Sequence, residues 1–131
     1  MNERLVIEHW LIRHDEKGNI QFQIDGESYS IGKAPRADIR LATRSPLVAP
    51  THAILTRLGH NVAFYYQIKA VNYPPSSAYE LRVNGEKVEI YRLQDGDIIN
   101  FTPNVFLIYH RLERIESISL KPDCVFSFFE L

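Results

Sequence analysis

His52 is the side chain best suited to acid–base chemistry, and its neighbours decide whether it can act. It lies in residues 47–55, LVAPTHAIL, where a proline-containing loop meets an apolar run. A histidine that acts as a general base needs an orienting partner and a nucleophile within reach. Ala49 and Pro50 supply neither. We therefore predict a structural, hydrogen-bonded His52 and no catalytic residues.

Other reactive residue types are scattered along the chain. The five histidines show no metal-ligand spacing, and Cys124 is the only cysteine. The sequence contains neither a nucleophile elbow nor a glycine-rich phosphate loop. It therefore predicts a protein that is not an enzyme and that uses no metal and no cofactor.

A basic segment leads up to His52. Four cations and one anion lie between residues 32 and 52, namely Lys33, Arg36, Arg40, Arg44 and Asp38. The segment thus carries 4 − 1 = +3, and the rest of the chain −1 − 3 = −4. Gathered at one end of the fold, these cations would attract an acidic segment or a phosphate. The alternative is a solvated edge with Arg40 pointing outward.

Composition limits the classes of protein. The chain has 131 residues, 45% hydrophobic and 24% charged, which suits one globular domain. Its net charge of −1 gives no electrostatic case for nucleic-acid binding. The sequence has no apolar run of the roughly 18 residues that a membrane helix needs. The single cysteine and the charged N-terminus favour a cytoplasmic protein without membrane contact.

Strand signals dominate the sequence. Alternating or β-branched runs are separated by turn pairs such as Asp25-Gly26, Asn84-Gly85 and Asp95-Gly96. About ten short strands predict an all-β antiparallel sandwich. Two proline-containing loops stand out by length, residues 42–50 and 72–78. Loops at one end of a sandwich are where binding residues usually lie.

Four segments resemble the forkhead-associated (FHA) domain in order and spacing: YSIGKAPRADIRL, VAPTHAIL, SAYELRVNGEKV and LQDGDIINF. The resemblance covers roughly residues 5–110. It is closest to small bacterial members. It implies an FHA/SMAD-like sandwich of ten or eleven strands whose end loops bind phosphothreonine peptides, and thus a role in signalling.

The resemblance assigns roles to individual positions. Lys33 lies where the family has an arginine that contacts phosphate, and His52 matches the histidine that braces the loop before it. The remaining matches are structural: Gly32, Asp38, Asn84, Gly85 and Gly96.

The departures fall on ligand-binding positions. Ala49 stands where the family has a phosphate-binding serine, and Pro50 where it commonly has an arginine. Tyr79 and Glu80 replace an Asn-Gly pair whose asparagine grips the peptide. Losing the serine and asparagine hydrogen bonds removes about 3–6 kcal/mol, or roughly 10²–10⁴ in affinity. Three features are candidates to replace these lost contacts in part: the hydroxyl of Thr51, two residues after Ala49, the ring of Tyr79, and the hydroxyls of Ser76 and Ser77. For the two serines, ordinary loop packing is the favoured role.

Residues 113–131 follow the predicted sandwich, residues 1–112, as a C-terminal tail. Ile115 and Ile118 have helical spacing, and VFSFFEL at residues 125–131 carries three phenylalanines. The tail is expected to pack on the sandwich edge or to form a contact with another chain.

These observations favour a non-enzymatic protein-interaction module with weakened or lost phosphothreonine recognition. Its partner is expected to be a protein or peptide, acidic or phosphorylated. One alternative is a working phosphothreonine reader, and another is a structural protomer that assembles through the tail. Oligomeric state is left open. The predicted loop-rim binding residues are Lys33, Arg36, Arg44, Ala49, Thr51, Ser77 and Tyr79.

Overall fold

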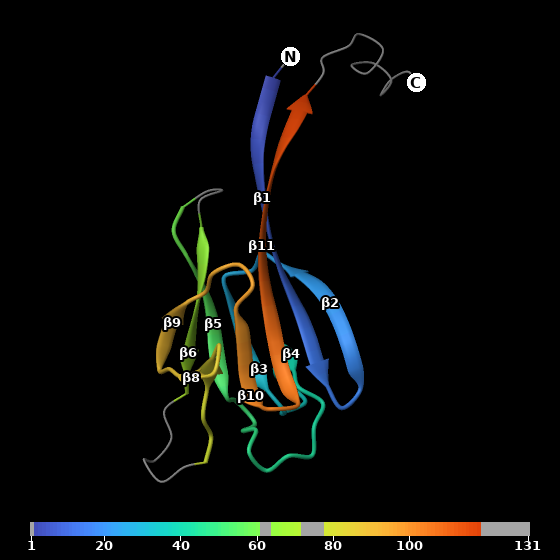
Figure 1. Cartoon of the computed structure of the whole chain (residues 1–131), viewed down its shortest axis with the longest axis vertical. Coiled ribbons are helices and arrows are strands. Elements are labelled where there is room, and N and C mark those ends of the chain that lie inside the picture. The colour runs from blue at the N-terminus through green and yellow to red at the C-terminus, as the bar shows by residue number, and fades with distance from the viewer. Residues whose placement is uncertain (1, 61–63, 72–77, 119–131) are drawn as a thin grey trace.

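The computed structural model describes residues 2–60, 64–71 and 78–118. Two packed sheets make up the described fold (Figure 1). The six-stranded sheet runs in the order β2 (Gly18–Ile24), β1 (Asn2–Asp15), β11 (Val105–Ile118), β10 (Ile98–Thr102), β7 (Arg82–Val83), β8 (Glu86–Lys87). The five-stranded sheet runs in the order β4 (Ile39–Arg40), β3 (Ser28–Gly32), β5 (Ala53–Leu58), β6 (Tyr65–Ala70), β9 (Ile90–Arg92). This confirms the predicted all-β sandwich, in which every pair is antiparallel except β3 with β4.

Alternating side chains fill the space between the sheets. On β2, Ile20, Phe22 and Ile24 share the predicted face, but only Ile24 is buried, and Ile20 is 50% exposed. Ile20 lies near the β1–β2 turn, away from the second sheet, so the periodicity gives its direction but not its burial. The fully covered side chains include Leu11, Ile31, Leu41, Leu55, Tyr66, Ile68, Ile99, Leu107 and Tyr109.

The predicted hairpins form where local turn chemistry is strong. Asn84 (φ 53°) and Gly85 (φ 88°) join β7 to β8, a two-residue turn with both residues at positive φ. The run after this turn behaves differently from the prediction. Glu86 and Lys87 pair with β7, whereas Ile90 begins β9 in the other sheet. One predicted strand therefore serves both layers.

The last strand is longer than predicted. The sequence placed its end near Leu112, but β11 continues to Ile118 and pairs with β1 along its whole extra length. A partner strand supplies backbone hydrogen bonds that an isolated helical turn would lack, so the helical spacing of Ile115 and Ile118 is overridden. The predicted boundary at 112 thus falls inside a strand. Residues 119–131, including VFSFFEL, lie outside the described residues, and their role stays a prediction.

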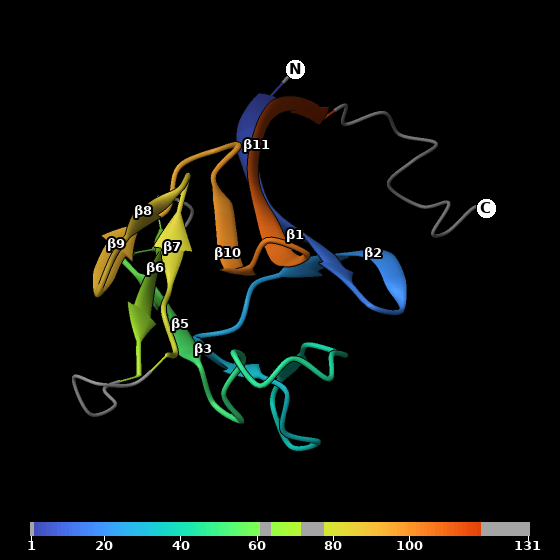
Figure 2. The same cartoon turned by 60° about the horizontal axis from the view of Figure 1, so that its bottom comes forward.

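The loops after β3 and β4 and the chain leading into β7 lie at one end of the sandwich, which we call the loop end (Figures 1 and 2). β1 begins and β11 ends at the opposite end (Figure 1). Among the described residues, no helix is long and apolar enough to cross a membrane.

Candidate functional site

The end of β3 is joined to the loop before β5 by close backbone contacts. The backbone N–H of Lys33 donates to the Ala49 carbonyl and that of Ala34 to the Pro50 carbonyl, both at 3.1 Å. A Cβ built on Gly32 would lie 2.0 Å from the Pro50 carbonyl oxygen. Position 32 must therefore be glycine for this loop to close onto β3.

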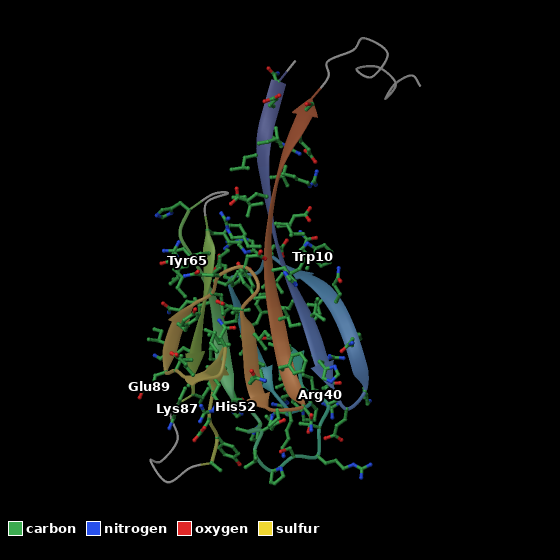
Figure 3. The ribbon with its side chains drawn as sticks, viewed as in Figure 1. Trp10, Arg40, His52, Tyr65, Lys87 and Glu89 are labelled. Carbon is green, nitrogen blue, oxygen red and sulfur yellow. The ribbon has the colours of Figure 1, made fainter. Side chains whose placement is uncertain are left out.

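His52 links this loop to the chain before β7. Its Nδ1 accepts the Ala49 N–H at 3.0 Å, and its Nε2 lies 2.7 Å from the Glu80 carbonyl oxygen. An amide N–H can only donate and a carbonyl can only accept, so the neutral tautomer with its proton on Nε2 satisfies both. Burial lowers the pKa of His52, against the opposing effect of the Glu80 bond. Figure 3 shows His52 toward the loop end, with Arg40 at the same end.

The β1–β2 turn supports the loop after β4 from the other side. The Asp15 carboxylate accepts the Ala42 N–H at 2.9 Å and lies 3.0 Å from Arg13 Nε. The Glu16 carboxylate accepts the Thr43 hydroxyl at 2.5 Å and the Arg44 N–H at 2.7 Å. These bonds lower the pKa of Glu16, and its charge lies beside that of Arg44.

The predicted cations differ in how exposed they are. Lys33 is half-buried, and its Nζ donates to the Ser45 carbonyl at 2.9 Å. Arg36, Arg40 and Arg44 are exposed. Lys33 is therefore partly occupied by its own loop, while the arginines present charge to solvent.

The predicted polar rim is incomplete. Ala49 is 0% exposed, so even its methyl group is covered. Tyr79 is half-buried, and its ring meets the His52 ring edge to face at 5.9 Å. Thr51 is also half-buried, and Ser77 lies outside the described residues. The structure thus brings Lys33, Ala49, His52 and Tyr79 to one end.

The other predicted structural residues stabilise turns. Asp38 accepts the Ser30 N–H at 2.8 Å and so ties β3 to the start of β4. Asn84 Nδ2 donates to the buried Asp97 carboxylate at 2.8 Å. Gly96 has φ 89° in the β9–β10 connection, which lies away from the loop end and takes no part in the candidate site (Figure 1).

An apolar pocket of about 300 Å³ opens beside Glu80, in the chain that leads into β7. Leu47, Phe101 and Pro103 supply its apolar walls, and Glu80 and Arg82 its polar rim, where their side chains pair at 2.9 Å. These residues come from distant parts of the sequence, so no sequence pattern predicted the pocket.

The sequence analysis also did not predict three residues that support the site, Asp15, Glu16 and Ser45. Asp15 and Glu16 lie 27 or 28 positions before the loop groups that they bind, and no periodicity or motif indicates such a contact. The only available signal is their position in the turn sequence DEKG.

The described residues contain no group of three or more histidine, cysteine, aspartate or glutamate side chains placed to hold a metal. At the loop end, backbone amides, one neutral imidazole and the Asp15 and Glu16 carboxylates hold the loops together, and the exposed Arg36 and Arg44 lie in the same loops. The exposed arginines suit recognition of an anion.

Comparison with known proteins identifies the fold family. The family model described as "FHA domain" matches residues 29–102. The crystal structure of the Slr1951 protein from Synechocystis sp. is 35% identical with a TM-score of 0.68, covering 79% of this chain and 97% of that chain. No curated protein sequence gives a significant match.

Two more distant structures share the fold. The FHA domain of CT664 from Chlamydia trachomatis is 19% identical with a TM-score of 0.61, covering 79% of this chain and 96% of that one. The yeast Dun1 FHA domain, in complex with a doubly phosphorylated peptide derived from Rad53, is 19% identical with a TM-score of 0.60, covering 90% and 83%. Because the family model spans more than half of the sequence, the chain belongs to the FHA domain family of phosphopeptide-binding protein-interaction modules.

Proposed function

We propose that this FHA domain is a non-enzymatic interaction module whose loop end binds a protein partner with weakened or lost dependence on phosphothreonine. The observation that carries the proposal is Ala49, which has no hydroxyl and no exposed surface at the position of the family's phosphate-binding serine. A hydrogen bond to a charged group is worth about 1.5–3 kcal/mol, so its loss alone lowers affinity roughly tenfold to 150-fold.

The position of Lys33 supports the same proposal. One of the three donors of its ammonium group is used by the Ser45 carbonyl, which holds the side chain against its own loop. Lysine also lacks the bidentate geometry with which arginine binds phosphate. The cation at this position therefore offers charge without the directed donors of the family arrangement.

The apolar pocket indicates what the partner contributes. Its walls of Leu47, Phe101 and Pro103 suit an apolar side chain. The exposed Arg36 and Arg44 favour acidic residues elsewhere in the partner. We therefore expect a segment with an apolar anchor and flanking acidic residues.

A phosphothreonine peptide library and its unphosphorylated copy provide the direct test, measured by fluorescence anisotropy. We expect neither library to bind tighter than about millimolar, the level to which the lost donors would reduce a micromolar reader, and little difference between the two. Lys33→Ala should change neither titration, and Lys69→Ala serves as an exposed-lysine control. Micromolar binding that requires phosphate and disappears in Lys33→Ala would overturn the weakened-site proposal.

Capture of partners from a lysate tests the second part of the proposal, that the loop end binds a protein. Wild type, Arg36→Glu/Arg44→Glu and Lys69→Ala are compared as baits, with the lysate either treated with phosphatase or untreated. Proteins retained by wild type and Lys69→Ala, lost by the arginine variant and unaffected by phosphatase would support the proposal. Identical captures by all three baits would contradict it.

A working phosphothreonine reader that uses Lys33, Arg36, Arg44 and Thr51 is the second candidate, because Arg36 and Arg44 are exposed. Recognition dominated by these cations predicts affinity that falls steeply with ionic strength. Binding that is insensitive to salt would remove this candidate.

A further inference from the structure

The terminal halves of β1 and β11 form a ribbon that projects beyond the sandwich (Figure 1). Asn2–Glu8 pairs with 112–118, and we call these two segments the terminal ribbon. On one side, β2 pairs with β1 only from His9 onward. On the other, the last described bond to β11 runs from the Arg111 N–H to the Asp95 carboxylate, at 3.0 Å. Within the described residues, both long edges of the ribbon lack a neighbouring strand.

A two-stranded ribbon of this kind is marginally stable on its own in water. Its side chains also leave apolar surface uncovered, since Leu5 is 40%, Leu112 49% and Ile115 61% exposed. An edge with free backbone groups and exposed apolar residues is a template for another strand. The terminal ribbon therefore offers an edge on which another strand can pair.

The backbone direction along β11 shows which groups face the open edge. Tyr109 exchanges both of its backbone hydrogen bonds with the β9–β10 side, at 2.9 and 2.7 Å, and the Arg111 N–H points the same way. Backbone groups alternate in direction along a strand. The N–H and C=O groups at the open edge therefore belong to Glu113, Ile115 and Ser117.

We propose that this open edge pairs with the same edge of a second copy of this chain, antiparallel, about a two-fold axis at Ile115. In this register Ile115 faces Ile115 of the second copy, and Glu113 faces Ser117. Each of the three facing pairs exchanges both backbone hydrogen bonds. The two ribbons then form one four-stranded sheet.

The side chains of this register complement one another. Arg114 already pairs with Glu8 and Glu116 of its own chain, at 3.2 and 2.8 Å. In this register it also faces Glu116 of the second copy, and the symmetry repeats this contact on the other side of the axis. Leu5 is already opposite Ile115 within the chain. Pairing therefore makes a continuous apolar row, Leu5–Ile115–Ile115–Leu5, from side chains that are now exposed.

The open edge of β1 is a poorer candidate. Pairing it with itself about Val6 would set Arg4 against Glu8, but the next hydrogen-bonded row requires His9, whose edge is already covered by β2. Pairing it about Leu5 instead keeps three rows, with Glu3 facing Ile7, but sets Arg4 against Val6 and so forms no ion pair. The β11 edge combines three uninterrupted rows with charge-complementary neighbours.

Sedimentation velocity of the full chain over a range of concentrations is the first test. We expect a reversible dimer that is lost in Ile115→Lys at concentrations where the parent is fully dimeric. Ile20→Lys, a second exposed isoleucine on a strand, should leave the dimer intact. Melting curves should show that both variants fold. A monomer at every concentration, or a dimer unaffected by Ile115→Lys, would overturn the proposal and leave the edge to a different partner.

Charge exchange tests the register. Arg114→Glu and Glu116→Arg should each be monomeric, because each sets like charges opposite one another at both symmetry-related pairs. Mixed in equal amounts, they should form a heterodimer, since each remaining charge then faces its opposite. Both variants also lose ion pairs within the ribbon, so amide hydrogen exchange of residues 112–118 is measured to show that the ribbon persists. If it persists and the mixture stays monomeric while the parent is dimeric, this register is wrong.

Disulfide trapping gives a readout that does not depend on surface charge. In a Cys124→Ser background, Ile115→Cys should cross-link to itself, because only position 115 faces its own copy. Ser117→Cys should not cross-link alone but should do so when mixed with Glu113→Cys. Equal cross-linking at 115 and 117 would contradict the two-fold axis at Ile115.

Discussion

The Nε2 atom of His52 lies 2.7 Å from the carbonyl oxygen of Glu80, and this contact joins two loops that are 28 residues apart in sequence. The other ring nitrogen accepts the Ala49 N–H. One neutral imidazole thus satisfies a buried donor and an acceptor. The shape of the loop end consequently depends on a side chain that needs no contact with a ligand.

Removing the imidazole should destabilise the domain. His52→Ala leaves the Ala49 N–H and the Glu80 carbonyl without their partner and opens a cavity beside Phe101, whose ring meets the imidazole at 5.0 Å. We expect a loss of about 2–4 kcal/mol in the free energy of unfolding, measured by urea denaturation. His60→Ala, at an exposed position, should stay within about 0.5 kcal/mol of wild type. Equal effects at the two positions would contradict the bracing role.

Gly32→Ala should act through a steric clash alone. The added Cβ would meet the Pro50 carbonyl oxygen at 2.0 Å, and the backbone cannot yield without breaking the Lys33 and Ala34 bonds to the loop. We expect a loss of at least about 3 kcal/mol, with the loop displaced. Gly96→Ala meets no atom within 4 Å but requires φ near 89°, so it should lose only about 1–2 kcal/mol. A milder effect at Gly32 than at Gly96 would show that the loop contact is dispensable.

Local features of the fold could be predicted from the sequence, whereas contacts between distant segments could not. Asn84-Gly85 indicates its turn because the two residues themselves favour positive φ. The division of residues 86–92 between two sheets depends on β6 being present to pair with Ile90. Similarly, β11 extends to Ile118 because β1 lies beside it, which no property of residues 113–118 alone indicates.

The candidate site shows the same limit. The family resemblance predicted the structural roles of Gly32 and His52, and it put Ala49 at the position of the family's phosphate-binding serine. It could not show that the Ala49 methyl is covered, that Lys33 binds Ser45, or that Glu16 supports the loop after β4. Each of these depends on how a loop closes in three dimensions, where sequence periodicity carries no information.

Loss of the Glu16 carboxylate should loosen the loop after β4. Glu16→Gln keeps the size of the side chain but weakens the charge-assisted bonds from the Thr43 hydroxyl and the Arg44 amide. We expect several-fold faster hydrogen exchange of the Arg44 amide, measured by NMR. Glu27→Gln is the matched control, because Glu27 lies 3.9 Å from Arg57 and is highly exposed. Unchanged exchange at Arg44 would show that other contacts hold this loop.

Restoring the serine should not restore phosphate binding. Because Ala49 is fully covered, the hydroxyl of Ala49→Ser would lie out of reach of a ligand. We expect less than about a tenfold gain in affinity for phosphothreonine peptides, below the range that one new bond to a charged group supplies. Lys33→Arg/Ala49→Ser provides the stronger comparison. A gain of 100-fold from Ala49→Ser alone would show that the loop opens readily in solution.

His9 should make the domain sensitive to mild acid. It is buried between Phe64, whose ring stacks on it at 4.4 Å, and Tyr109, whose hydroxyl lies 2.5 Å from Nδ1. Burial, assisted by the charge of Arg111, lowers the pKa of His9 to about 4. The unfolded chain, with an ordinary pKa near 6.5, therefore binds more protons than the folded one between these values.

Stability should consequently fall as the pH drops from about 6.5 toward 4, by on the order of 3 kcal/mol from His9 alone. Urea denaturation at several pH values measures this slope. His9→Phe should begin less stable at pH 7, because the Tyr109 hydroxyl loses its partner, but should show a flatter curve through this window. Carboxylates that titrate in the same range affect wild type and variant alike, so the difference between the two curves isolates His9. Parallel curves would mean that His9 is protonated as easily in the folded domain as in the unfolded chain.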